Sequence, residues 1–510
     1  MRKKVIFLIV IGFIFALIGF YLSSCTPRGI GGGPILAGLL QDQPSVFGVS
    51  TFKMTGSNPQ PLEFAFAYYN NTFEPFRFVN YNLTSNSFVS FSFSNNFASQ
   101  ISGRKVLIFG SGWVRGNADA TSKEIFWVGK IINSNLNASD IGTSGGFKFI
   151  IGRNFVARVS VPGAFDSNFD NLRLRKDDNF SDYQITDFDD PNQDFRAVNF
   201  VPFSTSSYIG AIAGRNVAFY STTNNNNLST WQNAINNNNQ NDPNRPSNFI
   251  AFDVIPSGSI TNPFVIIIGS DAGETQGEFR VYSSFSNSWG INLASSFTPY
   301  IGNNPLYSAD YVGAANQVDR IDTAGVCGRG SLGFYKDSNT DGIADPPGAG
   351  DLWIFYSNPN INFYGINIIK DTNNNRFIAV GYDNVSQKAV IYRGIVQDSN
   401  NDLMLDNNVG GNNNPIEVDL SNLNLDLKEI VFFDVNSSGE NVFVVGVDTS
   451  NCNIKPYPSP GVPTLTKSLL FPAATTSDAD IIDLFQDMRG VILYSNDGGQ
   501  SFNLISSLLK

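Results

Sequence analysis

Short apolar runs recur along this chain, and seven of them stop at a glycine. The stops follow one another at a mean spacing of 56 residues and are Gly110, Gly152, Gly214, Gly269, Gly328, Gly381 and Gly446. A short run without polar positions is typical of a strand that is buried on both faces. The pattern therefore predicts one such strand in each repeat, ending at a glycine where a turn begins and another backbone segment approaches closely.

A second apolar run follows most of these glycines and closes on a tyrosine, as in V-A-F-Y (217–220) and V-I-L-Y (491–494). Five repeats carry a residue suited to turns two positions after the glycine, namely Asn154, Asn216, Asp271, Asp383 and Asp448. First strands are expected before the glycine runs, at 248–258, 366–375 and 428–439. Fourth strands are expected after the tyrosine runs, at 288–294, 351–357, 416–420 and 501–507.

Four short strands in each repeat of this length are the signature of a β-propeller. Helical periodicity is nearly absent, apart from a short turn at 478–488. The predicted fold is all-β, a β-propeller over residues 46–510 with seven four-stranded blades, and with eight as the alternative. The uncertain part is the amino-terminal one, where 62–69, 76–82 and 87–94 alternate like strands but have no glycine stop.

Residues 1–24 are predicted to be a signal peptide, because basic residues precede a continuous apolar stretch at 5–21. Its end, Leu22-Ser23-Ser24-Cys25, resembles a bacterial lipobox, which implies lipid attachment to Cys25 and cleavage just before it. A single transmembrane anchor is the alternative that the length of the run allows. Thr26 follows the cysteine where enteric inner-membrane lipoproteins have Asp, so an outer-membrane or cell-surface location in the envelope is expected. Residues 25–45 are interpreted as a flexible tether.

The net charge and the composition limit the partners that the chain can bind and the reactions that it can catalyse. Without the signal peptide the chain has a net charge of about −14, which repels nucleic acid and anionic lipid heads, so the membrane contact is expected to be the lipid. The 510 residues include no histidine. This excludes Ser-His-Asp hydrolysis, His-ligated zinc and imidazole acid–base chemistry. Besides Cys25, the chain has Cys327 and Cys452, which could form a disulfide in an oxidising envelope or stay as two buried thiols.

The most specific motif is S-N-D-G-G-Q-S-F at 495–502, directly after Tyr494. It resembles the Asp-box (BNR-like repeat) of known propellers, which lies in the hairpin between the third and fourth strands of a blade. The resemblance implies a structural role for Ser495, Asp497, Gly499 and Phe502. With residues 428–446 and 490–502, the last blade looks most like the propeller family of photosystem II stability and assembly factors.

Two acidic loops have oxygen ligands at alternate positions. Asp337, Asn339, Asp341 and Asp345, with Gly342 for the turn, suit a hard cation such as Ca²⁺. They resemble the calcium loops of dockerins and thrombospondin-type repeats, although the twelfth position is Gly348 where an EF-hand has Glu. The loop at 398–406 repeats the spacing but has Leu403 where the glycine belongs. A polar turn without an ion is the alternative for both, so Ca²⁺ is the one cofactor considered and no cofactor is certain.

The longest insertion runs from Asp448 to Gly490, within the last blade, and carries Cys452 and the proline cluster 456–463. Long connections of this kind are commonly functional, and partner contact is expected here. The predicted function is a lipid-anchored, non-catalytic binding or scaffold protein whose partner is an envelope protein or a glycan. The alternatives are a sialidase-like glycoside hydrolase and a calcium-dependent glycan-binding adhesin. The sequence does not determine the oligomeric state.

Overall fold

The structure is a computed structural model of the whole chain. It describes residues 45–53, 62–69, 77–82, 87–91, 105–109, 114–116, 123–132, 146–152, 155–161, 172–175, 194–202, 208–223, 232–235, 242–258, 261–314, 317–336, 346–347, 351–369, 375–397, 403–406, 414–438, 440–465 and 489–505.

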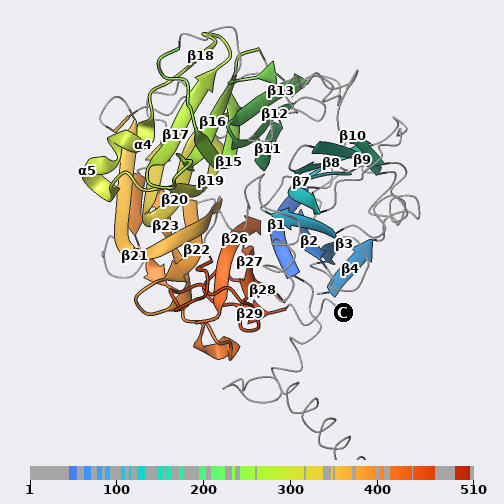
Figure 1. Ribbon diagram of the computed structural model, residues 1–510, viewed down its shortest axis with the longest axis vertical. Helices are drawn as coiled ribbons and strands as arrows, with labels where there is room; N and C mark the ends of the chain where they lie inside the picture. Colours follow the sequence, from blue (N-terminus) through green and yellow to red (C-terminus); the bar gives the residue numbers. More distant parts are fainter. Residues whose placement is uncertain are drawn as a thin grey trace, which may run out of the picture. The chain divides into compact units, whose positions relative to one another are not determined.

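These residues form β-strands almost throughout (Figure 1). The strands are β1 (Ser45–Lys53), β2 (Leu62–Tyr69), β3 (Arg77–Asn82), β4 (Ser87–Phe91), β5 (Lys105–Phe109), β6 (Val114–Gly116), β7 (Lys123–Ile132), β8 (Gly146–Gly152), β9 (Phe155–Val161), β10 (Leu172–Arg175), β11 (Asp194–Pro202), β12 (Tyr208–Arg215), β13 (Val217–Thr223), β14 (Gln232–Asn233), β15 (Phe249–Gly258), β16 (Pro263–Asp271), β17 (Gly277–Ser283), β18 (Ser288–Trp289), β19 (Leu306–Ala314), β20 (Gln317–Lys336), β21 (Leu352–Ile369), β22 (Asn375–Asp383), β23 (Lys388–Gln397), β24 (Leu403–Asp406), β25 (Ile416–Glu417), β26 (Ile430–Ser438), β27 (Asn441–Asp448), β28 (Arg489–Ser495) and β29 (Asn503–Leu504). The short helices are α4 (Leu293–Ser296), α5 (Thr298–Ile301) and η1 (Ser421–Leu423).

Four-stranded antiparallel meanders follow one another from β11 onward. Three of them are β11–β14, β15–β18 and β26–β29. The other two share long strands, because β20 turns back on itself at Gly330 (φ +73°) and β21 passes from one meander into the next. This repeated unit is the blade of a β-propeller, so the predicted fold class is confirmed. The number of blades stays a prediction.

The two meanders between β19 and β25 follow from the pairing register. A β-carbon built on Gly333 would lie 3.1 Å from Val326, so the two halves of β20 are neighbours. The second half of β20 pairs with residues 352–357, and residues 361–369 pair with β22. We call these blades the β19 blade (β19, both halves of β20, 352–357) and the β21 blade (361–369, β22, β23, β25). In the blades from β11 onward we call the first strand of each blade the inner strand and the fourth the outer strand, as is usual for a β-propeller.

The amino-terminal strands pair in the order β10-β9-β8-β7-β6-β1-β2-β3-β4, with β5 beside β7. Strands β1 to β4 form one antiparallel meander, which agrees with the alternation predicted for residues 62–94. Two short contacts, β1 with β6 and β7 with β8, are parallel. In the part of the chain that the structure describes, no helix is long and apolar enough to cross a membrane.

Four of the repeated glycines are needed for the same structural reason, which is the close approach of a neighbouring strand. Opposite each of four of them the inner strand contains a β-bulge. A β-carbon on the glycine would lie 2.8 to 3.0 Å from a Cα of that bulge, and the pairs are Gly269 with Ala251, Gly328 with Leu306, Gly381 with Phe363 and Gly446 with Phe432. The predicted close approach is therefore confirmed. The predicted strand ends are wrong at three glycines, because β16, β22 and β27 continue to Asp271, Asp383 and Asp448, whereas β8 ends at Gly152 as predicted.

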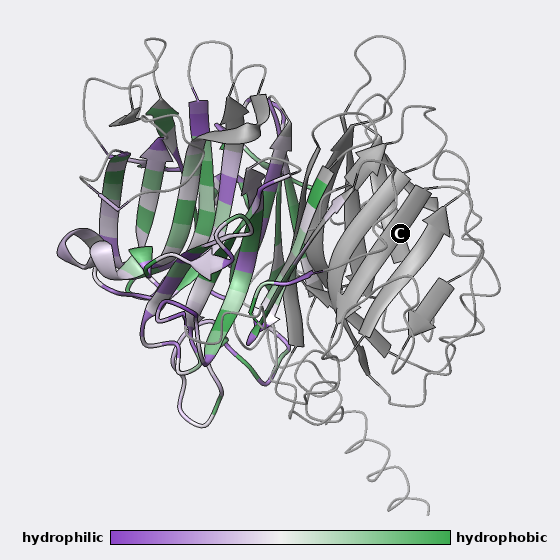
Figure 2. Cartoon of the chain, turned by 90° about the horizontal axis from the view of Figure 1, so that it is seen from above, coloured by the Kyte–Doolittle hydropathy of each residue, from purple (hydrophilic) through white to green (hydrophobic). Residues whose placement is uncertain are grey.

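Each of these bulges carries a buried aromatic residue, and neighbouring aromatics meet between blades. The four are Phe252, Tyr307, Tyr364 and Phe433, all less than 5% exposed. The ring centroids of Phe252 and Tyr307 lie 5.5 Å apart, and those of Tyr307 and Tyr364 lie 5.4 Å apart. The hydrophobic bands that Figure 2 shows along the described strands continue this core between the sheets. Neighbouring blades are thus joined by aromatic contacts between their inner strands and by hydrophobic clusters between their sheets.

The outer strands are shorter than predicted, with one exception. Of the segment 288–294 only Ser288 and Trp289 are strand, because the side chain of Asn292 accepts a hydrogen bond from the backbone of Ala294 (3.1 Å) and caps α4. The segments 416–420 and 501–507 likewise contain only β25 and β29. The predicted strand at 351–357 is confirmed at almost full length. The turn predicted at 478–488 lies outside the described residues.

Candidate functional site

A repeated hydrogen bond holds the connection between the second and third strands in four of the described blades. The first residue after the second strand donates its N–H to the carbonyl just before the inner strand. The pairs are Ala272 to Asn248 (2.9 Å), Arg329 to Pro305 (2.9 Å), Asn384 to Asn360 (2.8 Å) and Thr449 to Glu429 (2.8 Å). Only the last of these four blades has a carboxylate at the acceptor position, and its connection is the long insertion at 449–488.

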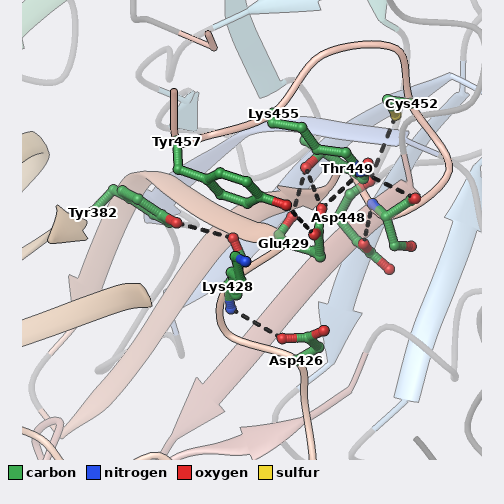
Figure 3. A network of polar contacts seen from close by, with 10 residues as sticks. Tyr382, Asp426, Lys428, Glu429, Asp448, Thr449, Cys452, Lys455 and Tyr457 are labelled. Atoms are coloured by element: carbon green, nitrogen blue, oxygen red, sulfur yellow. Dashed lines mark hydrogen bonds and ion pairs between the residues drawn. The ribbon is translucent and has the colours of Figure 1, made fainter. Parts of the chain in front are cut away.

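The side chain of Glu429 holds the start of this insertion (Figure 3). Lys455 Nζ lies 2.8 Å from Glu429 Oε2, and the Tyr457 hydroxyl donates to Oε1 over 2.7 Å. Lys455 also donates to the backbone carbonyls of Thr449 (2.8 Å) and Ser450 (3.1 Å). The side chains of Lys455 and Glu429 are only 17% and 15% exposed. Charge-assisted hydrogen bonds of this kind, shielded from water, fix the insertion to the blade.

The electrostatics of the network fit an ionised Glu429. Burial would raise the pKa of this carboxyl, but hydrogen bonds from Lys455 and Tyr457 and the charges of Lys455 and Lys428 lower it below its ordinary value. Burial and the neighbouring Glu429 raise the pKa of Tyr457 to about 12. The ammonium of Lys428 lies 4.4 Å from the centroid of the Tyr457 ring, a cation–π contact.

The described part of the insertion, residues 449–465, is an ordered loop that we call the anchored loop. Its base is buried through Cys452, Ile454 and Leu465. Leu465 donates its N–H to the carbonyl of Lys455 (2.6 Å), which closes the loop. At the tip Val462 donates to the carbonyl of Ser459 (3.1 Å), and Gly461 has φ +74°. Proline followed by a glycine with positive φ is the signature of a type II turn. Pro458, Pro460 and Pro463 are exposed on it.

The structure places the residues of the Asp-box match in the hairpin between β28 and β29. Asp497 Oδ1 accepts hydrogen bonds from Ser495 Oγ (2.6 Å) and from the backbone of Gln500 (2.9 Å) and Ser501 (3.0 Å). Gly499 has φ +81° and donates to Ser495 Oγ (2.8 Å), and Phe502 is buried in the core of the last blade. These side chains are occupied within the hairpin, and the arrangement is structural.

Other predicted sites fall partly or wholly outside the described residues. Cys25 and the acidic loop of Asp337, Asn339, Asp341 and Asp345 are among them. The strands that flank this acidic loop are described, and Lys336 pairs with Leu352. The loop therefore occupies the same connection, between third and fourth strands, as the hairpin at 495–502. Calcium binding there stays a prediction.

The disulfide considered between Cys327 and Cys452 is not formed, and both residues are buried thiols. Cys327 lies in β20, in the core of the β19 blade, whereas Cys452 lies at the base of the anchored loop. The sulfur of Cys452 is directed to the carbonyl of Asp448 (4.0 Å). The two thiols thus belong to separate blades, and each is used as a small buried side chain.

Carboxylates on the inner strands are a feature that sequence reasoning missed. Asp253 Oδ2 accepts hydrogen bonds from Ser308 Oγ and Ala309 N of the next inner strand (both 3.0 Å). Asp310 Oδ2 in turn accepts from Asn367 Nδ2 (2.6 Å) and Ile368 N (2.7 Å). A short hydrogen bond from Ser437 to Asn367 Oδ1 continues the series to β26. The signal was an acidic residue one or three positions after the aromatic residue of the first strand.

Asp310 is a carboxylate of this series with a strongly raised pKa. Burial raises its pKa to about 7, against the lowering effect of the hydrogen bonds from Ile368 and Tyr311, and the charges of Asp253 and Asp434 add to the rise. Because its oxygens already accept hydrogen bonds between blades, we assign Asp310 to blade contacts. Among the described residues, no group of three or more Asp, Glu or Cys side chains has the arrangement of a metal site.

A sialidase-like site would need several arginines that converge on a substrate carboxylate, but three described arginines near strand ends lie in different contacts. Arg280 pairs with Glu278 (2.7 Å) and donates to the carbonyl of Asn244 (2.6 Å). Burial raises the pKa of the Tyr307 hydroxyl, and the charge and a hydrogen bond of Arg329 partly oppose this rise. Arg393 is half-buried. Burial lowers its pKa, and the charge of Asp497 in the last blade partly opposes this effect. Three different surroundings are not a converging carboxylate-binding cluster.

Comparisons with known proteins give a fold likeness only. No family model matches the chain, and no curated protein is similar to it. Among solved structures, the Dos1 propeller is 11% identical with a TM-score of 0.40, and the match covers 79% of this chain and 91% of that one. A hypothetical selenium-binding protein from Sulfolobus tokodaii is 10% identical (TM-score 0.36; 70% and 88% covered). The Aleuria aurantia lectin is 9% identical (0.29; 80% and 88%). Likeness at this level carries no argument about function.

Proposed function

We propose that the chain is a lipid-anchored β-propeller of the cell envelope that binds a partner protein without catalysing a reaction. The observation that carries this proposal is the attachment of the anchored loop to Glu429 through Lys455 and Tyr457. A loop that is already ordered loses less conformational entropy when it binds, so the attachment favours a role in recognition.

The surface chemistry of the anchored loop supports a protein partner. Its tip presents Pro458, Pro460, Gly461 and Pro463 to solvent, and it has no charged side chain in residues 456–465. A rigid, weakly polar turn of this kind fits an apolar pocket on another protein better than the hydroxyl groups of a glycan, because it has few donors and acceptors to offer.

The proposed envelope location rests on the sequence around Cys25. Replacing Cys25 by Ala removes the acceptor for the lipid. We expect the wild-type chain to incorporate radiolabelled palmitate in a bacterial host, and the Cys25→Ala chain not to. If neither chain takes up label and both sediment with membranes, the result would contradict the lipid anchor and favour a transmembrane anchor.

The binding role is tested by replacing residues 456–463 with a Gly-Ser segment of equal length in the full chain. We expect formaldehyde cross-linking in intact cells to give a discrete adduct with another protein for the wild type, and to lose it for the replacement. The control replaces the 384–387 turn of the β21 blade in the same way, which should leave the adduct unchanged. Loss of the adduct in both variants, or in neither, would contradict the proposal.

A further inference from the structure

Two opposite charges from different blades act on one pair of buried tyrosines. Tyr307 and Tyr364, on the inner strands of the β19 and β21 blades, are 2% and 4% exposed, and their ring centroids lie 5.4 Å apart. Burial raises the pKa of both hydroxyls. The charge of Arg329 opposes this rise, and the charge of Glu274 adds to it. The guanidinium and the carboxylate therefore both lie close to the same two hydroxyls.

Arg329 is held at the point where β20 turns back on itself. Its backbone N–H donates to the carbonyl of Pro305 (2.9 Å), and Gly330 beside it has φ +73°. Its guanidinium donates a hydrogen bond to the hydroxyl of Tyr307. The side chain is exposed, and among the described residues it forms no ion pair. Because a guanidinium has five N–H donors, Arg329 keeps several of them for a ligand.

Glu274 provides the opposite charge from the connection between β16 and β17. The turn is ordered, since Glu274 N–H donates to the carbonyl of Asp271 (3.0 Å) and Ala272 N–H donates to that of Asn248 (2.9 Å). Glu274 has φ +52°, a conformation that is uncommon for a residue other than Gly, Asn or Asp. Its side chain is half-buried, and no cation of the described residues forms an ion pair with it. An uncommon backbone conformation that holds an uncompensated charge suggests a functional reason.

Neutral polar groups complete this cluster. Asn362 lies opposite Arg329 in the pairing register of β20 and β21, and its Nδ2 lies 3.4 Å from the hydroxyl of Tyr364. Because the pKa of each tyrosine hydroxyl is raised, both are protonated at neutral pH and can donate as well as accept. The β15, β19 and β21 blades thus bring together a cation, a carboxylate and two hydroxyls.

We propose that Arg329, Glu274 and Tyr307 form a binding site for the charged head of an α-amino acid. The carboxylate of the ligand pairs with the guanidinium of Arg329, whose parallel N–H groups match its two oxygens. The ammonium of the ligand pairs with the carboxylate of Glu274. A ligand with both charges satisfies both groups, whereas an anion alone would be repelled by Glu274 and a cation alone by Arg329. Binding is reversible and breaks no covalent bond, and the anchored loop belongs to a different blade.

The test is equilibrium dialysis of the full chain in detergent against radiolabelled glycine, which is the head group without a side chain. We expect saturable binding of glycine. Two competitors each lack one charge: N-acetylglycine has no ammonium, and glycinamide has no carboxylate. Each should displace glycine at least about tenfold less well than unlabelled glycine does, because one of the two ion pairs is lost.

Arg329→Gln and Glu274→Gln each remove one of the two charges, and each should weaken glycine binding by about tenfold or more. The matched controls are Lys388→Gln and Glu417→Gln, which neutralise the members of a more exposed ion pair (2.6 Å) on the β21 blade and should bind glycine like the wild type. Circular dichroism checks that each variant is folded.

A wild-type chain that does not bind glycine would overturn the proposal. Equal displacement by glycine and N-acetylglycine would show a site for anions instead, and equal displacement by glycine and glycinamide would show a site for cations. Glycine binding that neither Arg329→Gln nor Glu274→Gln weakens, or that the two controls weaken equally, would also contradict it.

Discussion

The hydroxyl of Tyr457 donates a 2.7 Å hydrogen bond to Glu429, 28 residues earlier in the chain. Glu429 immediately precedes the inner strand of the last blade, and Tyr457 belongs to the insertion between its second and third strands. Asn248, Pro305 and Asn360 occupy the position of Glu429 in other blades, where the connections are short. Among these four blades, the carboxylate therefore occurs only in the blade with the long connection. Substitution of Glu429 tests directly whether it holds that connection in place.

Neutralising Glu429 should destabilise the anchored loop. In Glu429→Gln the largely buried ammonium of Lys455 loses its counter-charge, and we expect unfolding to become easier by about 1 to 3 kcal/mol. Limited proteolysis should cut within residues 449–465 faster than in the wild type. The control is Glu417→Gln, whose partner Lys388 is more exposed (38% and 36% for the two side chains), so its cost should stay within about 0.5 kcal/mol. Equal effects of the two variants would contradict a special role for Glu429.

Acid should loosen the same loop. The pKa of Glu429 is lower in the fold than its ordinary value of 4.5. Its stabilising contribution is therefore complete above that value and is lost as the pH falls through the lowered pKa. We expect hydrogen exchange at the amide of Leu465, corrected for intrinsic rates, to accelerate below about pH 4. The amide of Val418, bonded to Ile391 (2.8 Å), should not show this change. Parallel behaviour of both amides would indicate global unfolding instead.

Asp310 should have the opposite pH dependence. Its pKa is raised from 3.8 to about 7, so the folded chain holds a proton that the unfolded chain has lost between these values. Stability due to this group therefore falls as the pH rises from about 4 to 7. Asp310→Asn keeps an acceptor for Ile368 and removes the charge, so it should raise the melting temperature at pH 8 and have little effect at pH 4. Asp419→Asn, at an exposed carboxylate with a lowered pKa, should give no such gain. A pH-independent loss in Asp310→Asn would refute the assignment.

The bulge-facing glycines should not tolerate a side chain. In Gly446→Ala the β-carbon would meet the backbone of Val431 and Phe432, which is held in the core of the last blade. We expect a loss of about 2 kcal/mol or more in chemical denaturation, because backbone atoms must move. The matched control is Gly273→Ala in the turn before β17, where the nearest atom would lie 3.5 Å away. Similar stabilities for the two variants would show that the close approach is not the reason for the repeated glycines.

The strands of the blades could be predicted from the sequence because apolar runs and turn residues are local patterns. A run such as 263–269 has one apolar face toward each neighbouring sheet, and Asp271 caps the turn that follows by accepting from Thr275 (2.6 Å) and Gln276 (2.9 Å). The strand was nevertheless placed too short at Gly269. The bulge that requires this glycine lies in another strand, at Ala251 to Asp253, and pairing register is not visible in a single run.

Only part of the candidate site could be predicted from the sequence. The length and prolines of the insertion at 449–488 marked it, but nothing near Glu429 in the sequence shows that its carboxylate receives Lys455 and Tyr457. The contacts of Asp310 with Asn367 and Ile368 span 57 and 58 residues, so they depend on how neighbouring blades pack. The two thiols at 327 and 452 could not be assigned either, because their separation depends on the same packing.

The central claim, that the anchored loop is a protein-binding surface, is tested most directly by a photo-cross-linking amino acid placed at Pro460 of the full chain in living cells. We predict a discrete adduct with another protein, absent when the same amino acid replaces the exposed Val385, and much reduced when Glu429→Gln is combined with the probe at Pro460. An adduct pattern that is the same at both positions, or one that does not respond to Glu429→Gln, would contradict the account.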